Sequence, residues 1–595
     1  MKLHQGRRRH GRSAVTNALV ALGFDLVVFA SCGVPAHAQT RDTEAAEYQR
    51  QQARERALRE QLAPQRRVQL ETPPPRPAGP LNFPAETPCF PIARVRVEGL
   101  PAEATDGWPW LLHGLPQQGW WQAEPRCLGV QGVQSIVDSL QGALIARGYV
   151  TSRALVAAQD LSRGELVVNI IPGRVRSILL DDDEGGKPAA VSLRNALPLR
   201  DSDLLNLRDI EQGLENLKRP PTADADIQIA PGDQPGQSDL HIRWHQASRI
   251  RLNASADDSG SRSTGRLQGS ATISCDNCLG LSDLGYLTVN HDLSSIGRGT
   301  QAQPQGTRGL SAYAAVPWGY ALLSLSGSRN TYRQSVAGAS QTYVYSGTTN
   351  QVEATVSRLV YRDARQKLTL SAKAFRRHSE NFIDDTEVLV QRRTVGGWGA
   401  SINHHLDTGE ASVDTTLAYR RGTGAFGALK APEEAFGEGT SRFAIITADV
   451  TAGLPIKLGD QLFSYSANWR WQGNRTPLTP QDRLAIGGRF TVRGFDGEQQ
   501  LAAERGWLLR QDLAWQVPDA PLGLRQLYLA VDYGRVGGPS AGRLLGTSLG
   551  GAVLGARWQL GQFSLDVFAG GPLHRPEHFR TPSFVTGFSF ACSFL

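Results

Sequence analysis

The sequence predicts a membrane β-barrel that is preceded by two small α/β modules. From about Arg249 to Leu595, apolar and polar residues alternate almost continuously, in short runs that glycines and polar clusters separate. Alternation with a period of two is typical of strands with one apolar face, and such strands can cross lipid without any long apolar segment. The mean hydropathy of −0.31 agrees with this class. We place the barrel at residues 248–595.

The chain begins with a pattern that predicts a secretory signal peptide over residues 1–38. A basic stretch is followed by an apolar run from about Ala18 to Ala30, and then by Ala36-His-Ala38. These are the three parts of such a signal, so we expect cleavage after Ala38. The segment contains five basic residues and one acidic residue, and without it the formal charge falls from +7 to +3. This near balance predicts no nucleic-acid partner.

Residues 39–62 predict a helix that is polar all round. Glu55 and Arg59, for example, are spaced so that they can pair along one helix face. A helix without an apolar stripe has no core to lie against, so either a solvated tail or a wet enclosure would suit it. Residues 63–91 hold nine prolines and predict an extended, semi-rigid linker.

Two similar modules follow, and we place them at residues 92–173 and 174–247. Each opens with an alternating strand, continues with a helical stretch and closes with two further strands. The helical stretch of the first module is indicated by apolar residues at helical spacing, which are Val130, Val133, Ile136, Val137, Leu140 and Leu144. In the second module the corresponding stretch runs from Leu207 to Leu217. The repeat predicts two related sheet-containing domains.

A long loop between two predicted strands is distinguished by its composition. It lies between residues 462–471 and 507–516, which alternate like barrel strands, and it contains Gly487-Gly-Arg-Phe-Thr-Val-Arg-Gly-Phe-Asp-Gly497. Glycine adopts backbone conformations that other residues avoid, so this segment can bend tightly and let its backbone approach other groups. By composition alone, however, a glycine-rich segment predicts no more than a loop.

A later strand, Gln526 to Gly534, places a carboxylate on its inward face. Its outer face, which we assign to lipid, is formed by Leu527, Leu529, Val531 and Tyr533. Tyr528, Ala530 and Asp532 then face the lumen. A carboxylate there needs a partner or water, and arginine is well matched to it because its planar fork can bind both oxygens.

Two short motifs resemble the signatures of the TpsB transporters of two-partner secretion. They are Val492-Arg493-Gly494-Phe495 in the loop and, in the strand, Tyr528-Leu-Ala-Val-Asp532-Tyr-Gly534, which fits the pattern aromatic-x-x-x-Asp-x-Gly. The resemblance implies that the loop folds back into the barrel lumen. It also implies that Arg493 pairs with Asp532, and that residues 39–62 form a helix that plugs the pore.

The two modules are similar to POTRA domains. The similarity rests on Gly148-Tyr-Val-Thr-Ser-Arg153 in the first module, and on Pro231-Gly232 with Gly236-Gln-Ser-Asp-Leu240 in the second. The resemblance as a whole implies a membrane β-barrel of about sixteen antiparallel strands, where the length alone would allow roughly fourteen to eighteen. It further implies two periplasmic POTRA domains and an N-terminal plug helix.

The function implied by this resemblance is protein export. A TpsB transporter is an outer-membrane pore of a Gram-negative bacterium that recognises and secretes one large partner exoprotein of the TpsA type, a haemolysin or filamentous adhesin, without nucleotide hydrolysis. We accordingly expect the exoprotein, outer-membrane lipid and the barrel assembly machinery as partners, a monomeric pore, and no cofactor or metal. Such barrels commonly end on an aromatic residue, whereas this chain ends with Phe594-Leu595.

Five cysteines follow the signal peptide and should reach an oxidising compartment. Cys89 and Cys127 flank one small module, and we expect them to pair. Cys275-Asp-Asn-Cys278 has a spacing that redox and zinc motifs share. No second cysteine pair or nearby histidine completes a metal site, so we expect a disulfide that pins a tight turn.

Two other classes of protein are weighed against the exporter. An outer-membrane assembly factor of the same superfamily would share the POTRA domains and the Arg-Gly-Phe loop, but usually has more POTRA repeats and lacks a plug helix. An enzyme carried on a barrel is suggested by Gly546-Thr-Ser548-Leu-Gly550, which matches the nucleophile elbow Gly-x-Ser-x-Gly. That elbow needs a strand–turn–helix context, whereas residues 552–558 predict a strand, so no catalytic residue is assigned.

Overall fold

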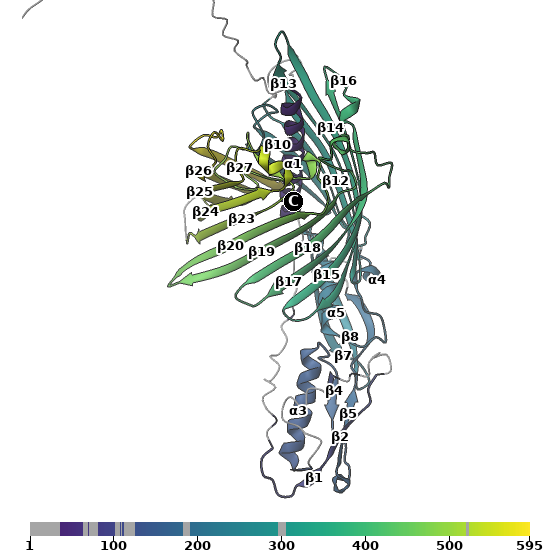
Figure 1. Cartoon of the computed structure of the whole chain (residues 1–595). Coiled ribbons are helices and arrows are strands. Elements are labelled where there is room, and N and C mark those ends of the chain that lie inside the picture. The colour runs from purple at the N-terminus through teal and green to yellow at the C-terminus, as the bar shows by residue number, and fades with distance from the viewer. Residues whose placement is uncertain are drawn as a thin grey trace, which may run out of the picture.

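A closed antiparallel barrel dominates the computed structural model, with the α/β modules below it (Figure 1). The structure describes residues 36–62, 70, 81, 83–101, 108, 110–111, 125–181, 191–294, 305–518 and 523–594. Nearly all of the predicted signal peptide and most of the proline-rich linker therefore lie outside the described residues.

Sixteen strands among the described residues form the barrel wall. They are β9 (Ile250–Asp257), β10 (Gln268–Asp276), β11 (Leu284–Asp292), β12 (Gly306–Trp318), β13 (Ala321–Ala337), β14 (Thr342–Arg362), β15 (Gln366–Ile383), β17 (Arg393–Asp407), β18 (Ser412–Thr423), β19 (Ala444–Leu458), β20 (Gln461–Asn474), β23 (Arg505–Gln516), β24 (Leu524–Gly537), β25 (Ser548–Leu560), β26 (Phe563–His574) and β27 (Val585–Phe594). The two-residue β16 (Thr386–Glu387) pairs only with the end of β15. The last strand pairs with the first, from Ser589 opposite Asp257 to Phe594 opposite Leu252, which closes the sheet.

The two faces of the wall differ in polarity as the alternation predicts. On β24 the side chains of Leu527, Leu529 and Val531 are exposed on the outer face, whereas Ala530 and Asp532 are buried inside. Because closure leaves no unpaired edge, lipid meets apolar side chains and no free backbone. The predicted class of membrane β-barrel with about sixteen strands is confirmed.

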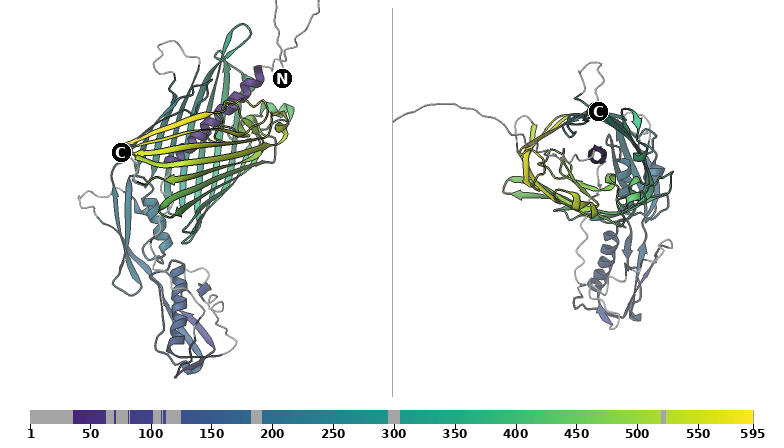
Figure 2. Two further views of the ribbon diagram at one scale, coloured as in Figure 1. Left: turned by 90° about the vertical axis from the view of Figure 1, so that its left-hand side faces the viewer. Right: turned by 45° about the horizontal axis from the view of Figure 1, so that its top comes forward.

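Helix α1 (Ala36–Leu62) lies inside the barrel, as the right-hand view of Figure 2 shows. It contacts the wall through polar side chains: Tyr48 donates to Gln351 on β14, at 3.1 Å, and Arg54 donates to Gln268 on β10, at 2.9 Å. No described helix is long and apolar enough to cross a membrane. A polar helix is stable here because the lumen supplies the polar surroundings that a protein core would deny it.

The first module packs one helix on a mixed three-stranded sheet. The sheet has the order β2 (Arg94–Glu98), β5 (Glu165–Ile171) and β4 (Arg153–Leu155), and α3 (Val130–Ala146) covers it. A separate antiparallel pair of short strands, β1 (Phe90–Ile92) and β3 (Arg126–Leu128), precedes the helix. The core includes Ile136, Leu140 and Leu144 from α3 and Leu166, Val168 and Ile170 from β5. Burying each such side chain contributes about 1.5–3 kcal/mol.

The N-terminus of α3 is capped by a residue from the end of the linker. Gly129, at the N-cap position, has no side chain with which to do this. Instead, the carboxylate of Glu86 accepts hydrogen bonds from the N–H groups of Gln131, Gly132 and Gly129, and these bonds lower the pKa of Glu86. A negative charge is stabilised at a helix N-terminus, so this contact fastens the linker to the first module. Cys89, which lies three residues beyond Glu86, forms a disulfide with Cys127.

The second module repeats this plan and continues directly into the barrel. Its sheet has the order β6 (Arg174–Asp181), β8 (Gln237–Gln246) and β7 (Ala223–Pro231), and α4 (Leu193–Ala196) and α5 (Leu207–Leu217) pack on it. Only residues 247–249 separate β8 from β9. The strand–helix–strand–strand order predicted for both modules is therefore confirmed.

Helix α5 is fastened to the rim of the barrel by buried ion pairs. Arg362, at the end of β14, donates from Nε to Glu211, at 3.1 Å, and from Nη2 to Glu215, at 3.0 Å. Lys367 on β15 also contacts Glu215. The Arg362 side chain is only 3% exposed. Removing one partner of such a buried pair costs several kcal/mol, because the remaining charge is left buried without compensation.

A second rim contact joins Asp209 of α5 to Tyr320, which lies in the turn between β12 and β13. The Tyr320 hydroxyl donates to the Asp209 carboxylate. Burial raises the pKa of Asp209 to about 6, although the hydrogen bond from Tyr320 acts in the opposite direction. This carboxyl group therefore changes its charge near neutral pH at the junction of the module and the barrel.

This junction should be firmer at pH 5 than at pH 7. The pKa of Asp209 is higher in the folded state than its ordinary value of about 3.9, so its stabilising contribution is complete below pH 4 and is lost as the pH rises through about 6. Hydrogen exchange of the α5 amides, corrected for intrinsic rates, should show more protection at pH 5.

The variant Asp209→Asn should remove this difference, whereas Asp201→Asn, which changes an exposed carboxylate of the same module, should keep it. Glu215 does not interfere, because Arg362 and Lys367 overcome its burial and lower its pKa, so it stays ionised throughout. An unchanged pH response in Asp209→Asn would contradict the assignment.

Candidate functional site

The loop between β20 and β23 fills part of the lumen. It contains the short helix η4 (Pro480–Asp482) and a hairpin of β21 (Leu484–Ile486) and β22 (Leu501–Ala503). Val492 and Phe495 are 0% and 3% exposed, in an apolar cluster with Ile486, Leu549 and Phe579. The loop thus carries its own small core, which packs on the inner side of β24 and β25.

Arg493 and Asp532 form a bidentate ion pair at the tip of this loop. Arg493 Nε donates to Asp532 Oδ2 and Nη2 donates to Oδ1, both at 2.7 Å. The backbone N–H of Arg493 adds a third bond to Oδ2, at 2.9 Å. The two side chains are 7% and 1% exposed. Charge-assisted bonds in this fork geometry are roughly twice as strong as neutral ones, so the pair holds the tip firmly to β24.

Arg493 has a further acceptor that the motifs do not include. Its Nη1 donates to Asp512 Oδ1 on β23, at 2.6 Å. Alternation within residues 507–516 places Asp512 on the polar face of its strand, but nothing in its sequence surroundings indicates this contact. The guanidinium is thereby shared between two neighbouring wall strands.

Glycines let the loop backbone lie directly against the wall. Gly494 has φ +91°, and a Cβ there would come within 2.4 Å of the Gly571 carbonyl oxygen. A Cβ on Gly551 of β25 would come within 1.9 Å of the Arg493 carbonyl oxygen. Gly534 faces Ile486 and Val492 of the loop in the same way. Three predicted motif residues, Arg493, Asp532 and Gly534, are therefore brought together.

Tyr528 of the strand motif occupies a separate place on the wall. Its hydroxyl donates to Asp566 on β26, at 2.8 Å, and the Arg557 guanidinium lies 4.1 Å from its ring centroid. The structure records no bond from Tyr528 to the loop among the described residues. Its aromatic ring instead packs beside the charged side chain of Arg557, and its hydroxyl binds the neighbouring Asp566.

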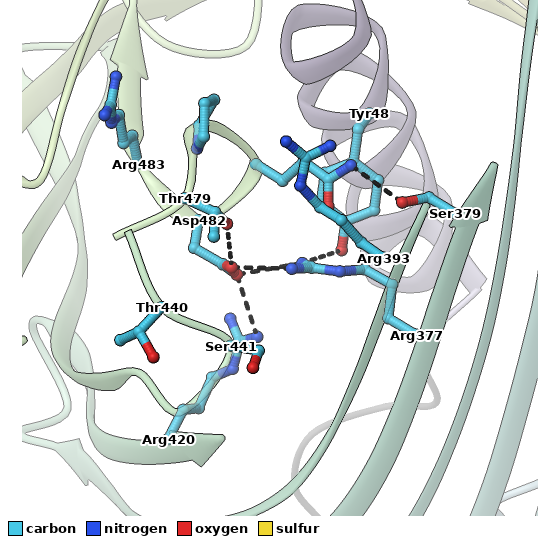
Figure 3. Close-up of polar contacts among 12 residues, drawn as sticks. Tyr48, Arg377, Ser379, Arg393, Arg420, Thr440, Ser441, Thr479, Asp482 and Arg483 are labelled. Carbon is cyan, nitrogen blue, oxygen red and sulfur yellow. Dashed lines mark hydrogen bonds and ion pairs between the residues drawn. The ribbon is translucent and has the colours of Figure 1, made fainter. Parts of the chain in front are cut away.

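A second ion pair holds the other arm of the loop, as Figure 3 shows. Arg377, on the inner face of β15, donates from Nη1 to Asp482 Oδ1, at 3.0 Å, and from Nη2 to Oδ2, at 2.7 Å. The same guanidinium donates to the hydroxyl of Tyr48 on α1, at 3.1 Å. None of these three residues lies in a recognisable motif, so the sequence alone does not predict their contacts.

The plug helix also touches both ends of the loop and one neighbouring turn. Gln49 donates to the carbonyl oxygen of Arg483, at 2.9 Å, and Arg50 donates to that of Gly497, at 2.7 Å. Glu47 accepts from Thr264, at 2.8 Å, in the segment between β9 and β10. The helix and the loop leave a cavity of about 850 Å³, lined largely by charged and polar residues. The interior is a wet, plugged channel.

The second cysteine pair lies at the periplasmic rim, away from the channel. Cys275 and Cys278 are joined across the turn between β10 and β11. Asp276 within this turn accepts from Arg251, at 2.8 Å, and from Thr222 of the second module, at 2.9 Å. No group of three His, Cys, Asp or Glu side chains within the described ranges is placed to hold a metal ion.

The fold and its plugged channel define an outer-membrane barrel of the POTRA superfamily. The family model described as haemolysin secretion/activation protein ShlB/FhaC/HecB matches residues 236–558. Two further models match the modules, namely the ShlB-type POTRA domain over residues 90–173 and the POTRA domain over residues 174–231. The chain belongs to the ShlB/FhaC/HecB family.

Individual relatives agree with this assignment. The outer membrane transporter CdiB-2 of Burkholderia pseudomallei is 37% identical, over 87% of this chain and 89% of its own length. The haemolysin transporter ShlB of Serratia marcescens is 25% identical, over 74% of each chain. The solved structure of CdiB from Acinetobacter baumannii covers 93% of this chain and 99% of its own, with 29% identity and a TM-score of 0.79.

These similarities decide between the two barrel classes. The chain is an outer-membrane transporter of two-partner secretion, with its POTRA domains in the periplasm, and the resemblance to TpsB proteins is confirmed. The alternative of an outer-membrane assembly factor is not supported.

Gly551→Ala should displace the tip of the loop from the wall. The added methyl group cannot coexist with the Arg493 carbonyl oxygen, so the loop must shift away from the wall, toward the axis of the barrel. Trypsin added to the purified protein should then cleave after Arg493, which is protected in the native chain. Gly537→Ala on the neighbouring strand is a matched control, because a Cβ there meets no atom within 4 Å. Equal resistance of the two variants would argue against the close approach.

Proposed function

We propose that this transporter secretes a large exoprotein of the CdiA type, through its own lumen and after the plug helix has left it. The preference for this type over a haemolysin is supported by the higher identity to CdiB-2 than to ShlB, 37% against 25%. The observation that supports a route through the lumen is that α1 is polar on all of its faces and lies in a polar channel.

The energetics of the plug favour a lumenal route. Each hydrogen bond between α1 and its surroundings contributes about 0.5–1.5 kcal/mol when both groups are neutral, and about 1.5–3 kcal/mol when Glu47, Arg50 or Arg54 takes part, because water can replace it. The seam between β27 and β9, in contrast, contains six residue pairs whose backbone groups would be left unpaired in lipid. Removing the helix into water is therefore the less costly way to open a path.

The finer properties of the pore follow from its closure and its chemistry. We propose a monomer, because a closed sheet offers no edge through which a second barrel could pair. Insertion by the barrel assembly machinery would begin at β27, whose last described residue is the aromatic Phe594, even though the chain ends with Leu595.

We also propose that the chain is not an enzyme. Ser548 Oγ lies 2.9 Å from His574 Nε2. However, Ser548 begins the barrel strand β25 and not a strand–turn–helix elbow. Within the described residues, no carboxylate is bonded to the other ring nitrogen of His574, so we interpret the contact as a cross-strand hydrogen bond at an exposed rim.

The role proposed for the Arg493–Asp532 pair is to hold the loop in its secretion-competent position. Val492, Gly494 and Phe495 support this position by packing, and Gly534 by leaving room for the loop. The Cys89–Cys127 and Cys275–Cys278 disulfides are proposed to be structural, since each pins a turn or hairpin outside the channel.

Arg493→Ala and Asp532→Ala should each impair secretion strongly while the barrel still inserts. Arg493→Ala leaves the Asp532 carboxylate buried without its bidentate partner, and Asp532→Ala leaves Arg493 with Asp512 alone, so each change costs up to about 3–5 kcal/mol. The double variant should be little worse than either single one, because all three lose the same interaction. Secretion is measured with candidate exoproteins from the same genome, co-expressed in a Gram-negative host.

Asp512→Ala is the matched control for this series. It removes an acceptor of Arg493 but leaves the bidentate pair with Asp532 in place, so its defect should be smaller. Fully additive defects of Arg493→Ala and Asp532→Ala, or normal secretion by either, would refute the proposed role.

The POTRA domains are proposed to bind the unfolded exoprotein in the periplasm. Each sheet has two outer strands, β2 and β4 in the first and β6 and β7 in the second, whose edges can accept an added strand. Deleting residues 92–246 should abolish secretion while the barrel keeps its heat-modifiable migration on gels. Normal amounts of exoprotein in the medium would show that recognition lies elsewhere.

A further inference from the structure

Arg377 is placed where the plug helix, the loop and the barrel wall meet (Figure 3). Its side chain is 5% exposed and comes from β15, whereas Asp482 lies in the loop and Tyr48 lies on α1. The Arg377 guanidinium stacks 5.0 Å from the Tyr48 ring centroid in addition to its hydrogen bond with the hydroxyl. One side chain of the wall therefore binds both movable elements at once.

The two sides of this contact differ in strength. Asp482 receives two charge-assisted bonds from Arg377 and a third bond from Thr479, at 2.9 Å, and Arg420 lies 3.8 Å away. Tyr48 contributes one neutral hydroxyl and one ring face. Two bonds between opposite charges in a buried pair are stronger than one bond from Arg377 to a neutral hydroxyl, so the loop is held more tightly than the helix.

Neighbouring contacts follow the same division. On the loop side, Gln481 donates to Ser379 of β15, at 3.3 Å, and Gln472 of β20 donates to the carbonyl oxygen of Asp482, at 3.0 Å. The helix side adds the bond from Gln49 to the Arg483 carbonyl oxygen. The arm is thus bonded to two wall strands without any help from the helix, while the helix rests on the arm.

We propose that Arg377 is a positioning residue that anchors the N-terminal arm of the loop through Asp482, and that Tyr48 docks the plug helix on this anchor. This inference rests on the proposed lumenal route. When the helix leaves, Asp482 keeps its partners, so the arm stays on the wall and the docking site for the helix is preserved. The loop then has two independent anchors, at Asp482 on β15 and at Arg493 on β24.

The first test separates the helix from the loop. Tyr48→Phe keeps the ring but removes the hydroxyl, so the open fraction of the pore in planar bilayers should rise about tenfold or more, the factor expected from one hydrogen bond to a charged group. Trypsin should still not cleave after Arg483. Tyr465→Phe removes a comparable phenolic bond, from β20 to Gln511 on β23, and should leave the conductance unchanged.

The second test releases the arm. Asp482→Asn and Arg377→Met should each make trypsin cleave after Arg483, at least tenfold faster than in the native chain, while Arg493 stays protected by its own anchor. Arg377→Met should also raise the open fraction, since the helix loses its dock. Arg377→Lys restores the charge without the fork, and should fall between Arg377→Met and the native chain.

Each variant is first checked for heat-modifiable migration, so that only folded barrels are compared. Protection of Arg483 in both Asp482→Asn and Arg377→Met would overturn the anchor. Cleavage after Arg483 in Tyr48→Phe, or an unchanged open fraction in that variant, would overturn the division between anchor and dock. All measurements use the purified protein without an exoprotein, so failure of the proposed secretion route would appear separately, in the secretion assay.

Discussion

Lipid offers no hydrogen bonds, and this constraint requires every backbone N–H and C=O of the wall to be paired within the sheet. A closed barrel satisfies the requirement, but with sixteen strands it encloses a lumen too wide for its own side chains to fill. The interior must then hold water or further segments of the chain. Helix α1 and the loop between β20 and β23 occupy this space, and their polarity follows from the polarity of the inward faces around them.

Charge pairing decides how firmly each occupant is held. The loop is bound at two carboxylate–guanidinium pairs, Arg493 with Asp532 and Arg377 with Asp482, which are both buried and bidentate. The helix relies on single hydrogen bonds. Some join neutral groups or reach backbone oxygens, and others involve one charged group, as in the bond from Arg54 to Gln268 and the bond from Thr264 to Glu47. The proposed lumenal route requires that the loop stays in the barrel and that the helix can leave it. The stronger ion pairs of the loop agree with this division.

The sequence predicts the elements of this structure better than their contacts. Period-two alternation identified the strands and showed that Asp532 faces inward, and the motif resemblance supplied its partner. Arg377 and Asp482 are 105 residues apart along the chain. Alternation predicts only that Arg377 points inward. Which residue it meets across the lumen depends on the stagger of the barrel and the path of the loop, and neither has a local signal. The same is true of Asp512, Tyr48 and the Arg362 contacts with α5.

The cap of helix α3 is supplied by a distant segment. Gly129, at the N-cap position, has no side chain that could accept hydrogen bonds from the first N–H groups of the helix. The missing cap is supplied by Glu86, 43 residues before Gly129, through the linker that the disulfide then fixes. No spacing rule connects a proline-rich linker with a helix so far along the chain, so only the three-dimensional structure reveals this contact.

The placement of the second POTRA module connects this architecture to transport. Helix α5 uses polar and charged side chains to bind two rim segments. Asn216 and Asp209 bind Gly319 and Tyr320 in the turn between β12 and β13, and Glu211 and Glu215 bind Arg362 at the end of β14. Its sheet is joined to the barrel through the short connection after β8. Among the described residues, the outer edge of β7 has no partner strand, and the outer edge of β6 is bridged only near its start, where Arg174 pairs with Leu204. A strand of exoprotein added to such an edge would be held at a fixed position beneath the pore. Fastening the module through its helix therefore leaves an outer edge of its sheet open to an added strand. Under the proposed lumenal route, a strand of exoprotein bound there would lie close to the channel.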